Sequence, residues 1–369
     1  MPKLDLVVGA RPNFMKAAPV VEALRTRFPD WDVQLVHTGQ HYDRAMSELL
    51  FEQLGMPEPD VNLGVGSGGH SEQLARLLVA LDARFASVKP DMIVVFGDVN
   101  STLAASLVAS RMLIPVAHVE AGLRSFDRTM PEEVNRVLTD SISTLLFTTE
   151  ASAEENLRSE GVDPKRIHFI GNVMIDTLMK HREAASAIDL PEQLGLAGKP
   201  YAVLTLHRPS NVDDEKAFQR IIGAIVEIAR DFPVVFPVHP RTRARIAASE
   251  AAAAATNLIL TEPLGYLEFL SLMQRASVIL TDSGGIQEEA LIIRVPCVTL
   301  RWNTERPVTL TGGANVLVGD DPGRIVSEAH AALRGDRAID VEPPAGWDGC
   351  AADRISGVLG DWFGSKIAN

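Results

Sequence analysis

Short apolar runs alternate with helix-length amphipathic segments along most of the chain, and this alternation constrains the fold more than any other feature. The first run covers residues 4–8 and is followed by a turn and by a helical pattern that ends near residue 28. Strands that alternate with helices form parallel sheets with helices on both faces. We predict further strands at residues 33–37, 92–96, 116–119, 145–148 and 167–170, and then at 201–206, 234–238, 258–260, 278–281 and 297–300.

The alternation pauses at residues 180–200, which are poor in strand signals. A chain of 369 residues is long enough for two domains. We therefore predict an α/β protein with two doubly wound, Rossmann-like domains facing a cleft. The predicted boundaries are residues 1–180 for the first domain, 181–350 for the second, and 351–369 for a closing C-terminal helix. A nucleotide or nucleotide-sugar is expected in the cleft, at the carboxyl ends of the strands.

Composition narrows the range of partners. The chain has 48 acidic residues against 35 lysines and arginines, which predicts no binding to nucleic acid or anionic membranes because such surfaces attract broad cationic faces. Two cysteines, Cys297 and Cys350, are too few for a disulfide framework and favour a reducing compartment. We find no signal peptide and no apolar stretch of the roughly 18 residues that span a bilayer. The prediction is a soluble, cytoplasmic protein.

Carboxylates cluster at the predicted strand ends of the first domain. Asp98 and Glu120 each end an apolar run, and Glu132 opens the helical pattern that follows. Neighbouring parallel strands bring their carboxyl ends to one edge of the sheet, so these groups are expected to converge. Carboxylates that share a partly dehydrated site shift each other's pKa values, as general acid and base catalysis requires. The alternative is that each one caps a helix or interacts with a helix dipole.

Two strand-to-helix turns have the composition of anion sites. Arg11 lies in a Gly-Ala-Arg-Pro turn, where a guanidinium and a helix N-terminus would favour a diphosphate; the alternative is a tight turn with a surface arginine. Ser283, Gly284 and Gly285 open a helix after an apolar strand. Adjacent glycines let backbone N–H groups approach phosphate oxygens, whereas an ordinary helix cap needs only the serine.

Histidines follow two strands of the second domain. His207 comes directly after the first strand of that domain, where its ring could contact phosphates or transfer protons. His239 repeats the arrangement after a later strand. For both, the alternative is a ring that hydrogen-bonds loop carbonyls.

A glycine run at residues 64–69 matches the dinucleotide pattern G-x-G-x-x-G, but it does not follow the first strand and we predict no nicotinamide cofactor there. A glycine loop over the cleft, or a plain flexible connection, are the two interpretations. The sequence has no H-E-x-x-H, C-x-x-C, P-loop or G-x-S-x-G motif, so zinc peptidase, P-loop NTPase and serine hydrolase functions have no support.

With these residues in view, the chain strongly resembles the UDP-N-acetylglucosamine 2-epimerase family over residues 4–359. The resemblance rests on motifs that fall in family order: GARPNFMKAAP, HTGQH, GDVNSTLA, HVEAGLRS, MPEEVNR, GNVMID, TLHRPSNVD, PVHPRT, LTDSGGIQEEA and NTERPVT. It implies a glycosyltransferase-B-type fold, a homodimer, a UDP-sugar substrate and no cofactor or metal. It also implies supply of precursors for surface polysaccharides.

The resemblance assigns roles to individual residues. Asp98, Glu120 and Glu132 would be the acid and base carboxylates, with His207 near the diphosphate. The residues on the nucleotide side would be Arg11 and Lys16 at the diphosphate, Ser283, Gly284 and Gly285 binding it, Glu289 at the ribose, Phe269 at the uracil and Arg306 as a further cation.

The implied reaction interconverts UDP-N-acetylglucosamine and UDP-N-acetylmannosamine. Removal of the C2 proton with loss of UDP gives a 2-acetamidoglucal, to which UDP adds back after reprotonation on the other face. The alternatives are a hydrolysing 2-epimerase, a glycosyltransferase of the same fold, and a nucleotide-sugar binding protein without activity. The Gly-Ala-Arg-Pro form also occurs in relatives that act on UDP-2,3-diacetamido-glucuronic acid, so the sugar's C3 and C6 substituents stay open.

Overall fold

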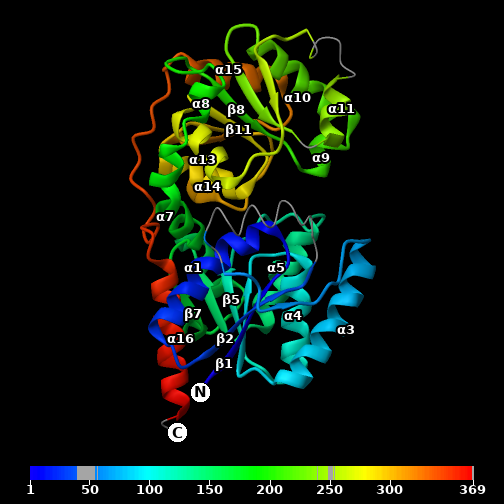
Figure 1. Cartoon of the computed structure of the whole chain (residues 1–369), viewed down its shortest axis with the longest axis vertical. Coiled ribbons are helices and arrows are strands. Elements are labelled where there is room, and N and C mark those ends of the chain that lie inside the picture. The colour runs from blue at the N-terminus through cyan, green and yellow to red at the C-terminus, as the bar shows by residue number, and fades with distance from the viewer. Residues whose placement is uncertain (40–54, 56, 239, 248–251, 253, 368–369) are drawn as a thin grey trace. The chain divides into compact units, whose positions relative to one another are not determined.

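The computed structural model describes residues 1–39, 55, 57–238, 240–247, 252 and 254–367. The chain folds into two compact units (Figure 1). Unit 1 comprises Met1–Lys180 together with Pro344–Asn369, and unit 2 comprises His181–Pro343. Helix α7, Val173–Ala187, crosses from one unit to the other, so the segment predicted as a junction is largely helical.

Unit 1 contains a parallel sheet of seven strands in the order β3-β2-β1-β4-β5-β6-β7. The strands are β1 (Lys3–Val8), β2 (Asp32–His37), β3 (Val61–Asn62), β4 (Met92–Phe96), β5 (Val116–Ala121), β6 (Leu145–Thr148) and β7 (Ile167–Phe169). All five residues of β4 are buried, as expected for a central strand covered on both faces.

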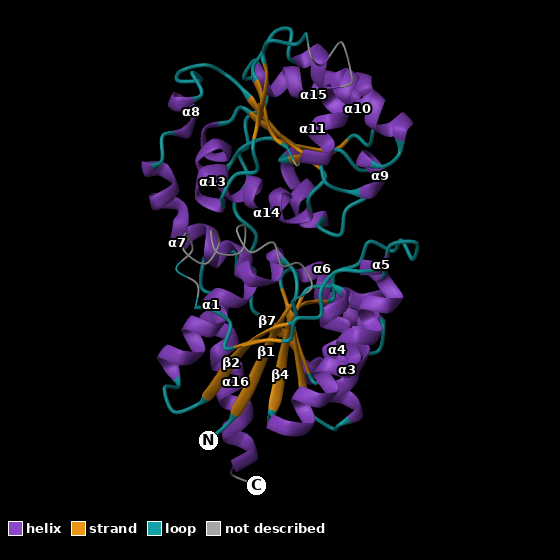
Figure 2. Cartoon of the chain, turned by 45° about the vertical axis from the view of Figure 1, so that its right-hand side comes forward, coloured by secondary structure: helices purple, strands orange, loops and turns teal. Residues whose placement is uncertain are grey.

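Helices cover both faces of this sheet (Figure 2). Helices α3 (His70–Val88), α4 (Asn100–Arg111) and α5 (Pro131–Ile142) pack in sequence on one face. Helix α1 (Arg11–Arg27) lies on the other face and packs against α16 (Ala351–Ile367), which belongs to unit 1 although it closes the chain. Among the described residues of this unit, α6 (Ala151–Ser159) and η1 (Pro164–Arg166) are further helical segments.

Unit 2 contains a parallel sheet of six strands in the order β10-β9-β8-β11-β12-β13. The strands are β8 (Ala202–Thr205), β9 (Val234–Pro237), β10 (Leu258–Thr261), β11 (Val278–Thr281), β12 (Cys297–Thr299) and β13 (Asn315–Leu317). The described helices are α8 (Leu190–Gln193), α9 (Pro209–Val212), α10 (Glu215–Ile228), α11 (Pro240–Ala247), α13 (Tyr266–Arg275), α14 (Gly284–Ile293), η2 (Pro307–Gly313) and α15 (Pro322–Leu333).

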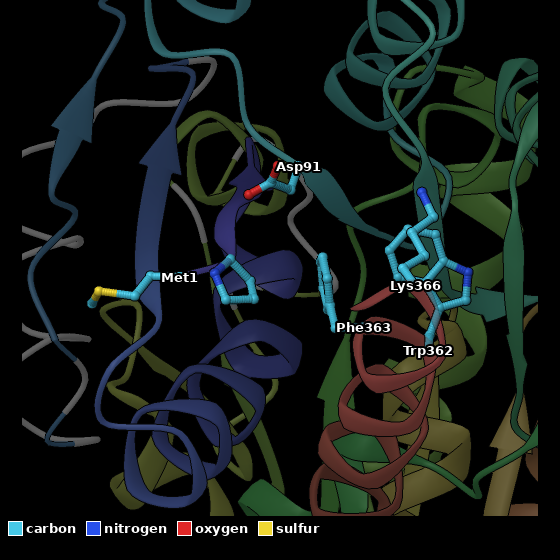
Figure 3. A pocket seen from close by; sticks show the side chains of 6 residues that line it. Met1, Asp91, Trp362, Phe363 and Lys366 are labelled. Atoms are coloured by element: carbon cyan, nitrogen blue, oxygen red, sulfur yellow. The ribbon is translucent and has the colours of Figure 1, made fainter. Parts of the chain in front are cut away.

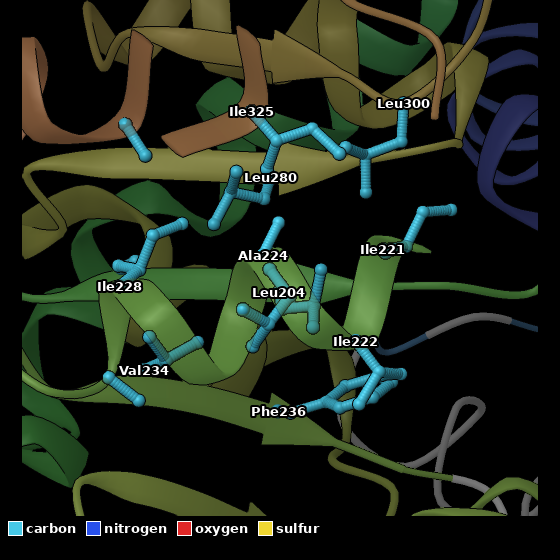
Figure 4. Packing of buried hydrophobic residues seen from close by; sticks show 14 of the residues in the cluster. Leu204, Ile221, Ile222, Ala224, Ile228, Val234, Phe236, Leu280, Leu300 and Ile325 are labelled. Carbon is cyan, nitrogen blue, oxygen red and sulfur yellow. The ribbon is translucent and has the colours of Figure 1, made fainter. Parts of the chain in front are cut away.

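The core of unit 2 forms between this sheet and α10 with α15. Leu204 of β8 and Leu280 of β11 are fully buried and face Ala224 of α10 and Ile325 of α15 (Figure 4). The apolar positions of α10 recur with helical spacing, and Ile221, Ala224, Ile225 and Ile228 are all buried. Burial of these side chains removes apolar surface from water and fixes the two central strands.

These sheets confirm the predicted α/β class with two Rossmann-like halves. The structure adds the short strands β3 and β13, which were not predicted. In each sheet the strand order reverses once, between β1 and β4 and between β8 and β11. Ligands of doubly wound sheets bind outside the carboxyl ends of the strands at this reversal.

Candidate active site

Side chains fix the turn that follows β4 in unit 1. The carbonyl oxygens of Phe96, Gly97 and Asp98 each accept a hydrogen bond from a side chain on another element. The donors are Asn13 and Thr102 to Phe96 (both 2.7 Å), His118 to Gly97 (2.8 Å) and Asn135 to Asp98 (2.9 Å). The turn lies at the reversal between β1 and β4, so four surrounding elements hold the backbone where a ligand is expected.

The Asp98 side chain pairs with a buried arginine. Arg136 of α5 contacts the Asp98 carboxylate through Nη2 and the Glu133 carboxylate through Nη1, the latter at 2.6 Å. The Asp98 side chain is 25% exposed, whereas the Arg136 side chain is 4% exposed. One carboxylate oxygen is therefore held from the protein side while part of the group still faces the exterior.

Glu120 lies in β5 with a strained backbone. Its φ of +74° falls in the left-handed region, and the pairing with β6 shifts register between Val119 and Ala121. An irregularity of this kind re-aims a side chain, and a residue other than glycine in this region costs about 1–2 kcal/mol. The buried Glu120 carboxylate forms an ion pair with Lys16 of α1 at 2.7 Å. Strain at a charged, ion-paired residue is typical of functional sites.

The predicted carboxylates surround Gly97. A Cβ built on Gly97 would lie 3.1 Å from Lys16 Nζ and 3.5 Å from Glu120 Oε1, so the Lys16–Glu120 pair lies beside the residue that precedes Asp98. Glu132 is half-buried in the first turn of α5, one turn before Arg136. The structure thus places Glu120 next to the turn that contains Asp98. Glu132 lies on α5, the helix whose Arg136 contacts Asp98.

A buried charge network supports β5 behind this cluster. His118 Nδ1 lies 2.7 Å from Asp140, and His118 Nε2 donates to the Gly97 carbonyl. Burial alone would raise the pKa of Asp140, but the hydrogen bond from His118 and the charge of Arg124 outweigh it and lower that pKa. Arg124 continues the network to Glu160 at 2.7 Å.

The first predicted anion turn opens α1. Arg11 is the first residue of α1, and its side chain is not described. Asn13 occupies the third position of α1, where a capping box usually has a glutamate or glutamine. Its Oδ1 accepts the N–H of the N-cap residue Ala10 at 3.1 Å, and its amide nitrogen donates to the Phe96 carbonyl. Asn13 therefore ties the α1 N-terminus to the turn after β4, across the strand-order reversal.

In unit 2, His207 follows β8 and is oriented by a buried aspartate. His207 Nδ1 lies 2.7 Å from Asp282, and the His207 side chain is 62% exposed. Burial would raise the pKa of Asp282, but the hydrogen bonds from the His207 ring and from the backbone N–H groups of Arg208 and His207 lower it. This aspartate fixes one ring nitrogen and leaves the exposed Nε2 edge for a ligand. His239, the second predicted histidine, lies outside the described residues.

The predicted phosphate loop forms the N-terminus of α14. Ser283 is the N-cap residue, its N–H donates to Thr281 Oγ1 at 3.0 Å, and Gly284 begins the helix with Gly285. A Cβ on Gly284 would lie 2.7 Å from Glu305 Oε1, so the glycine is required by close packing. The N–H groups of the first helical turn, which have no partner within a helix, are available to an anion here.

Two of the predicted nucleotide-side residues, Arg306 and Glu289, have buried partners. Arg306 is 5% exposed and pairs with Glu288 at 2.6 Å. The Glu289 carboxylate accepts the Tyr266 hydroxyl at 3.2 Å. Phe269 is half-buried on α13, one turn after Tyr266. The structure therefore places Arg306 and Glu289 inside unit 2, close to α14, with ion-pair or hydrogen-bond partners of their own.

Sequence reasoning missed the partners that orient these residues. Arg136 and Glu305 were not singled out, and the contact of Asp282 with His207 was not predicted, although each of these residues contacts a predicted site residue or its neighbour. Burial would raise the pKa of Glu305, but the charges of Arg306 and Arg301 hold it well below its usual range. The spacing of Glu133 and Arg136 by three residues on one helix was the only local signal for any of these pairs.

Two other features lie away from the strand-order reversals. The glycine run at residues 64–69 joins the edge strand β3 to α3. A pocket of about 290 Å³ lies at the amino ends of β1 and β4, lined by residues that include Pro2, Asp91 and Phe363 (Figure 3). Both belong to unit 1, and the pocket is at the edge of the sheet opposite to Asp98 and Glu120.

Comparison with known proteins identifies the family. The family model for UDP-N-acetylglucosamine 2-epimerase matches residues 23–360. The UDP-N-acetylglucosamine 2-epimerase of Methanocaldococcus jannaschii is 43% identical over 343 residues, covering 91% of this chain and 93% of the relative. The UDP-2,3-diacetamido-2,3-dideoxy-D-glucuronate 2-epimerase of Pseudomonas aeruginosa is 43% identical over 335 residues, covering 90% and 92%.

A solved structure gives the same answer. The crystal structure of M. jannaschii UDP-GlcNAc 2-epimerase in complex with UDP-GlcNAc and UDP superposes with a TM-score of 0.90 at 41% identity, covering 97% of this chain and 99% of that one. Sequence and fold agree over nearly the full length of both proteins. The chain therefore belongs to the UDP-N-acetylglucosamine 2-epimerase family.

Proposed function

We propose that this chain is a non-hydrolysing 2-epimerase that interconverts UDP-N-acetylglucosamine and UDP-N-acetylmannosamine. The observation that carries the proposal is the pair of carboxylates, Asp98 and Glu120, on neighbouring strands at the strand-order reversal of unit 1, each ion-paired to a cation. Epimerisation at C2 needs a proton removed from one face of the sugar and a proton delivered to the other. Two separately held carboxylates meet that need, and a single base does not.

The first half-reaction would remove UDP. A carboxylate takes the C2 proton, the C–H electron pair forms the C1–C2 double bond, and the C1–O bond breaks with its electrons on the β-phosphate oxygen. In the return half, the 2-acetamidoglucal is protonated at C2 on the opposite face and the UDP oxygen attacks C1. Lys16 holds the Glu120 carboxylate through an ion pair of 2.7 Å, and Glu132 is a third candidate acid.

Unit 2 would bind UDP in this scheme. The departing diphosphate gains negative charge, which the N-terminus of α14 at Ser283, Gly284 and Gly285 would stabilise through backbone N–H groups. The exposed edge of His207, oriented by Asp282, would donate to a phosphate oxygen. Arg11 would add a cation from unit 1. Because Arg306 and Glu289 have buried partners, we propose that they support the nucleotide side through α14 and α13.

A second substrate has a specific observation in its favour. The diacetamido-glucuronate epimerase of P. aeruginosa and the M. jannaschii UDP-N-acetylglucosamine epimerase are each 43% identical to this chain. Both reactions share the C2 chemistry and the UDP leaving group, and they differ in the C3 and C6 substituents. UDP-2,3-diacetamido-glucuronic acid is therefore the alternative substrate to test beside UDP-N-acetylglucosamine.

The test is turnover in deuterated water, with both UDP-sugars assayed separately. Deuterium at C2 of the recovered UDP-sugar, together with the C2 epimer, is the expected result by NMR. Release of free N-acetylmannosamine with UDP would mean a hydrolysing enzyme instead. Recovery of unlabelled UDP-sugar from both assays would overturn the proposal, and turnover only after addition of an acceptor would indicate a glycosyltransferase.

We also propose that the protein acts in the cytoplasm as a homodimer. Cys297 is a buried free thiol and Cys350 an exposed one, which suits a reducing compartment. Within the described segments, no helix combines the length and the apolarity needed to cross a membrane. Size-exclusion chromatography with light scattering at several concentrations tests the dimer, for which a mass of one chain at all concentrations would be the contrary result.

A further inference from the structure

We propose that Arg136 is a positioning residue that holds the Asp98 carboxylate in the orientation used for proton transfer at C2. The inference rests on the proposed function, because it gives Asp98 a catalytic role. It goes beyond that function by assigning the control of Asp98 to a buried side chain of α5.

The first argument is the bridging geometry. Arg136 uses two different nitrogens for two carboxylates, Nη1 for Glu133 at 2.6 Å and Nη2 for Asp98. A guanidinium is a rigid planar fork, so fixing one nitrogen fixes the direction of the other. The position of Nη2, and with it the Asp98 oxygen that it contacts, follows from where Glu133 holds the fork.

Glu133 is itself immobilised. Its side chain is 2% exposed, and its two oxygens accept three hydrogen bonds from the preceding loop. The donors are Ser125 N–H (2.9 Å), Ser125 Oγ (2.9 Å) and Phe126 N–H (3.0 Å). A continuous chain of contacts therefore leads from the loop backbone through Glu133 and Arg136 to Asp98.

The Asp98 backbone is held by the same helix. Asn135, the residue before Arg136, donates to the Asp98 carbonyl at 2.9 Å and also lies 3.2 Å from Asn100 Oδ1. Successive residues of α5 thus hold the carbonyl and the carboxylate of one amino acid. With the backbone fixed, the rotation of the Asp98 side chain is the freedom that remains, and Arg136 restricts it.

A purely structural role explains these contacts less well. Glu133 alone would neutralise the buried guanidinium, yet a second carboxylate is placed against it. That second carboxylate is the one that is 25% exposed and that lies at the strand-order reversal, where a ligand is expected. An arginine held by a fully buried acid and presented to a partly exposed one is the arrangement expected of a residue that orients a catalytic group.

Arg136→Lys is the principal test. Lysine keeps the positive charge beside Glu133 but replaces the rigid planar fork by a single rotatable ammonium, so the contact with Glu133 no longer fixes the direction of a second nitrogen toward Asp98. In the deuterium assay we expect kcat to fall on the order of 100-fold, the cost of a small misplacement of a catalytic group. KM and the UDP dissociation constant measured by calorimetry should stay within about 3-fold, because UDP is assigned to unit 2.

Chemical rescue separates positioning from folding. In Arg136→Ala, addition of guanidinium ion at low millimolar concentration should restore part of the lost kcat, because the ion can occupy the vacated site. Arg84→Lys is the matched control: Arg84 is partly buried and holds Asp5 through Nε (3.0 Å) and Nη2 (3.1 Å) in the same unit, and it is not part of the candidate site. Its kcat should be unchanged with or without guanidinium.

The outcomes are distinct. Wild-type turnover with an Arg136→Lys kcat within 3-fold of wild type would overturn the inference and leave the proposed function intact. A loss of kcat with an equal weakening of UDP binding would also overturn it, because that pattern means general disruption. Should Arg136→Ala not fold, Arg136→Lys decides alone. Absence of turnover by the wild-type chain would remove both proposals.

Discussion

The two units present different kinds of groups at corresponding points of their sheets. Beside the β1–β4 reversal, unit 1 carries two carboxylates: Asp98, which is partly exposed and paired with Arg136, and Glu120, which is buried in the neighbouring strand β5 and paired with Lys16 on a strained backbone. At the β8–β11 reversal, unit 2 presents the N-terminus of α14 and the ring of His207, while Glu305 and other acids are paired internally. The fold is repeated, and the chemistry is not.

This difference shows how one architecture serves two tasks. Backbone N–H groups at a helix N-terminus hold an anion with little change of charge, which suits binding. Carboxylates beside cations exchange protons, which suits chemistry at C2. Strain at Glu120 is consistent with the second role, because its left-handed backbone costs folding free energy and re-aims a buried, ion-paired carboxylate.

The largest expected effect is the loss of kcat when either candidate carboxylate of unit 1 is replaced. Glu120→Gln and Asp98→Asn should each lower kcat by roughly 10²–10⁴-fold, because the amides cannot accept the C2 proton. UDP affinity should change little, since UDP is assigned to unit 2. Deuterium incorporation by NMR and UDP calorimetry are the measurements. Glu22→Gln, which removes an exposed ion pair to Lys180, is the control and should be active; full activity of both site variants would refute the assignment of chemistry to unit 1.

Much of the fold could be predicted from the sequence. Continuous apolar runs such as 92–96 and 278–281 match β4 and β11 residue for residue, because central parallel strands are buried on both faces and need no polar alternation. The edge strands β3 and β13 were not predicted: β3 has only two residues, and both strands depend for their definition on pairing with the neighbouring strand.

The sequence predicted which strand ends carry the candidate site residues, but it did not predict the ion-pair partners of those residues. Asp98, Glu120, His207 and Ser283 follow strands, so topology alone brings them to the strand-order reversals. Their partners come from distant segments: Lys16 reaches Glu120, and Asp282 reaches His207. Contacts over such separations depend on three-dimensional packing, and the left-handed φ of Glu120 has no sequence signal because glutamate usually avoids that region.

A second prediction concerns two buried aspartates, one in each unit, whose pKa values are shifted in opposite directions. Asp176 in unit 1 accepts the N–H groups of Ala351 (3.1 Å) and Ala352 (2.7 Å) and so anchors α16. Burial, with the nearby charges of Asp348 and Asp353, raises the pKa of Asp176 to about 6. In unit 2, the contact with His207 instead lowers the pKa of Asp282.

The pH dependence of stability follows from these signs. A raised pKa means that the Asp176 contribution is fully present below the unfolded-state pKa of 3.8 and is lost as the pH rises through about 6. Relative to wild type, Asp176→Asn should gain roughly 2–3 kcal/mol of unfolding free energy between pH 4 and pH 7. Asp282→Asn should differ from wild type in the opposite sense and at lower pH, because the Asp282 contribution is present above the unfolded-state pKa of 3.8 and is lost as the pH falls below it. Urea denaturation from about pH 2 to pH 7 measures both effects; parallel curves for all three proteins would contradict the prediction.

A third prediction tests the binding role assigned to unit 2. Gly284→Ala places a Cβ 2.7 Å from Glu305 Oε1, so either the Glu305 carboxylate, which is ion-paired to Arg301, or the first turn of α14 must move. We expect UDP to bind about 10-fold more weakly, as one displaced hydrogen bond to an anion costs about 1.5 kcal/mol. Gly223→Ala on α10 is the matched control: its Cβ meets nothing within 4 Å, and the change should stabilise the helix by about 0.5–1 kcal/mol with UDP affinity unchanged. Equal UDP affinity in both variants would remove the α14 N-terminus from the site.

The smallest expected effect is the gain in unfolding free energy when a left-handed residue is replaced by glycine, either near the candidate site or elsewhere in unit 1. Phe126 (φ +59°, 76% exposed) lies on the loop held by Glu133, and Leu113 (φ +60°, 90% exposed) lies between α4 and β5. Replacing either by glycine removes a left-handed side chain with little loss of burial, and each should gain about 0.5–1 kcal/mol of unfolding free energy. If the Phe126 loop is a functional feature, only Phe126→Gly should also raise the KM for the UDP-sugar. An unchanged KM in both variants would mean that the exposed ring of Phe126 does not contact the substrate and that the role of this loop is confined to supporting Glu133.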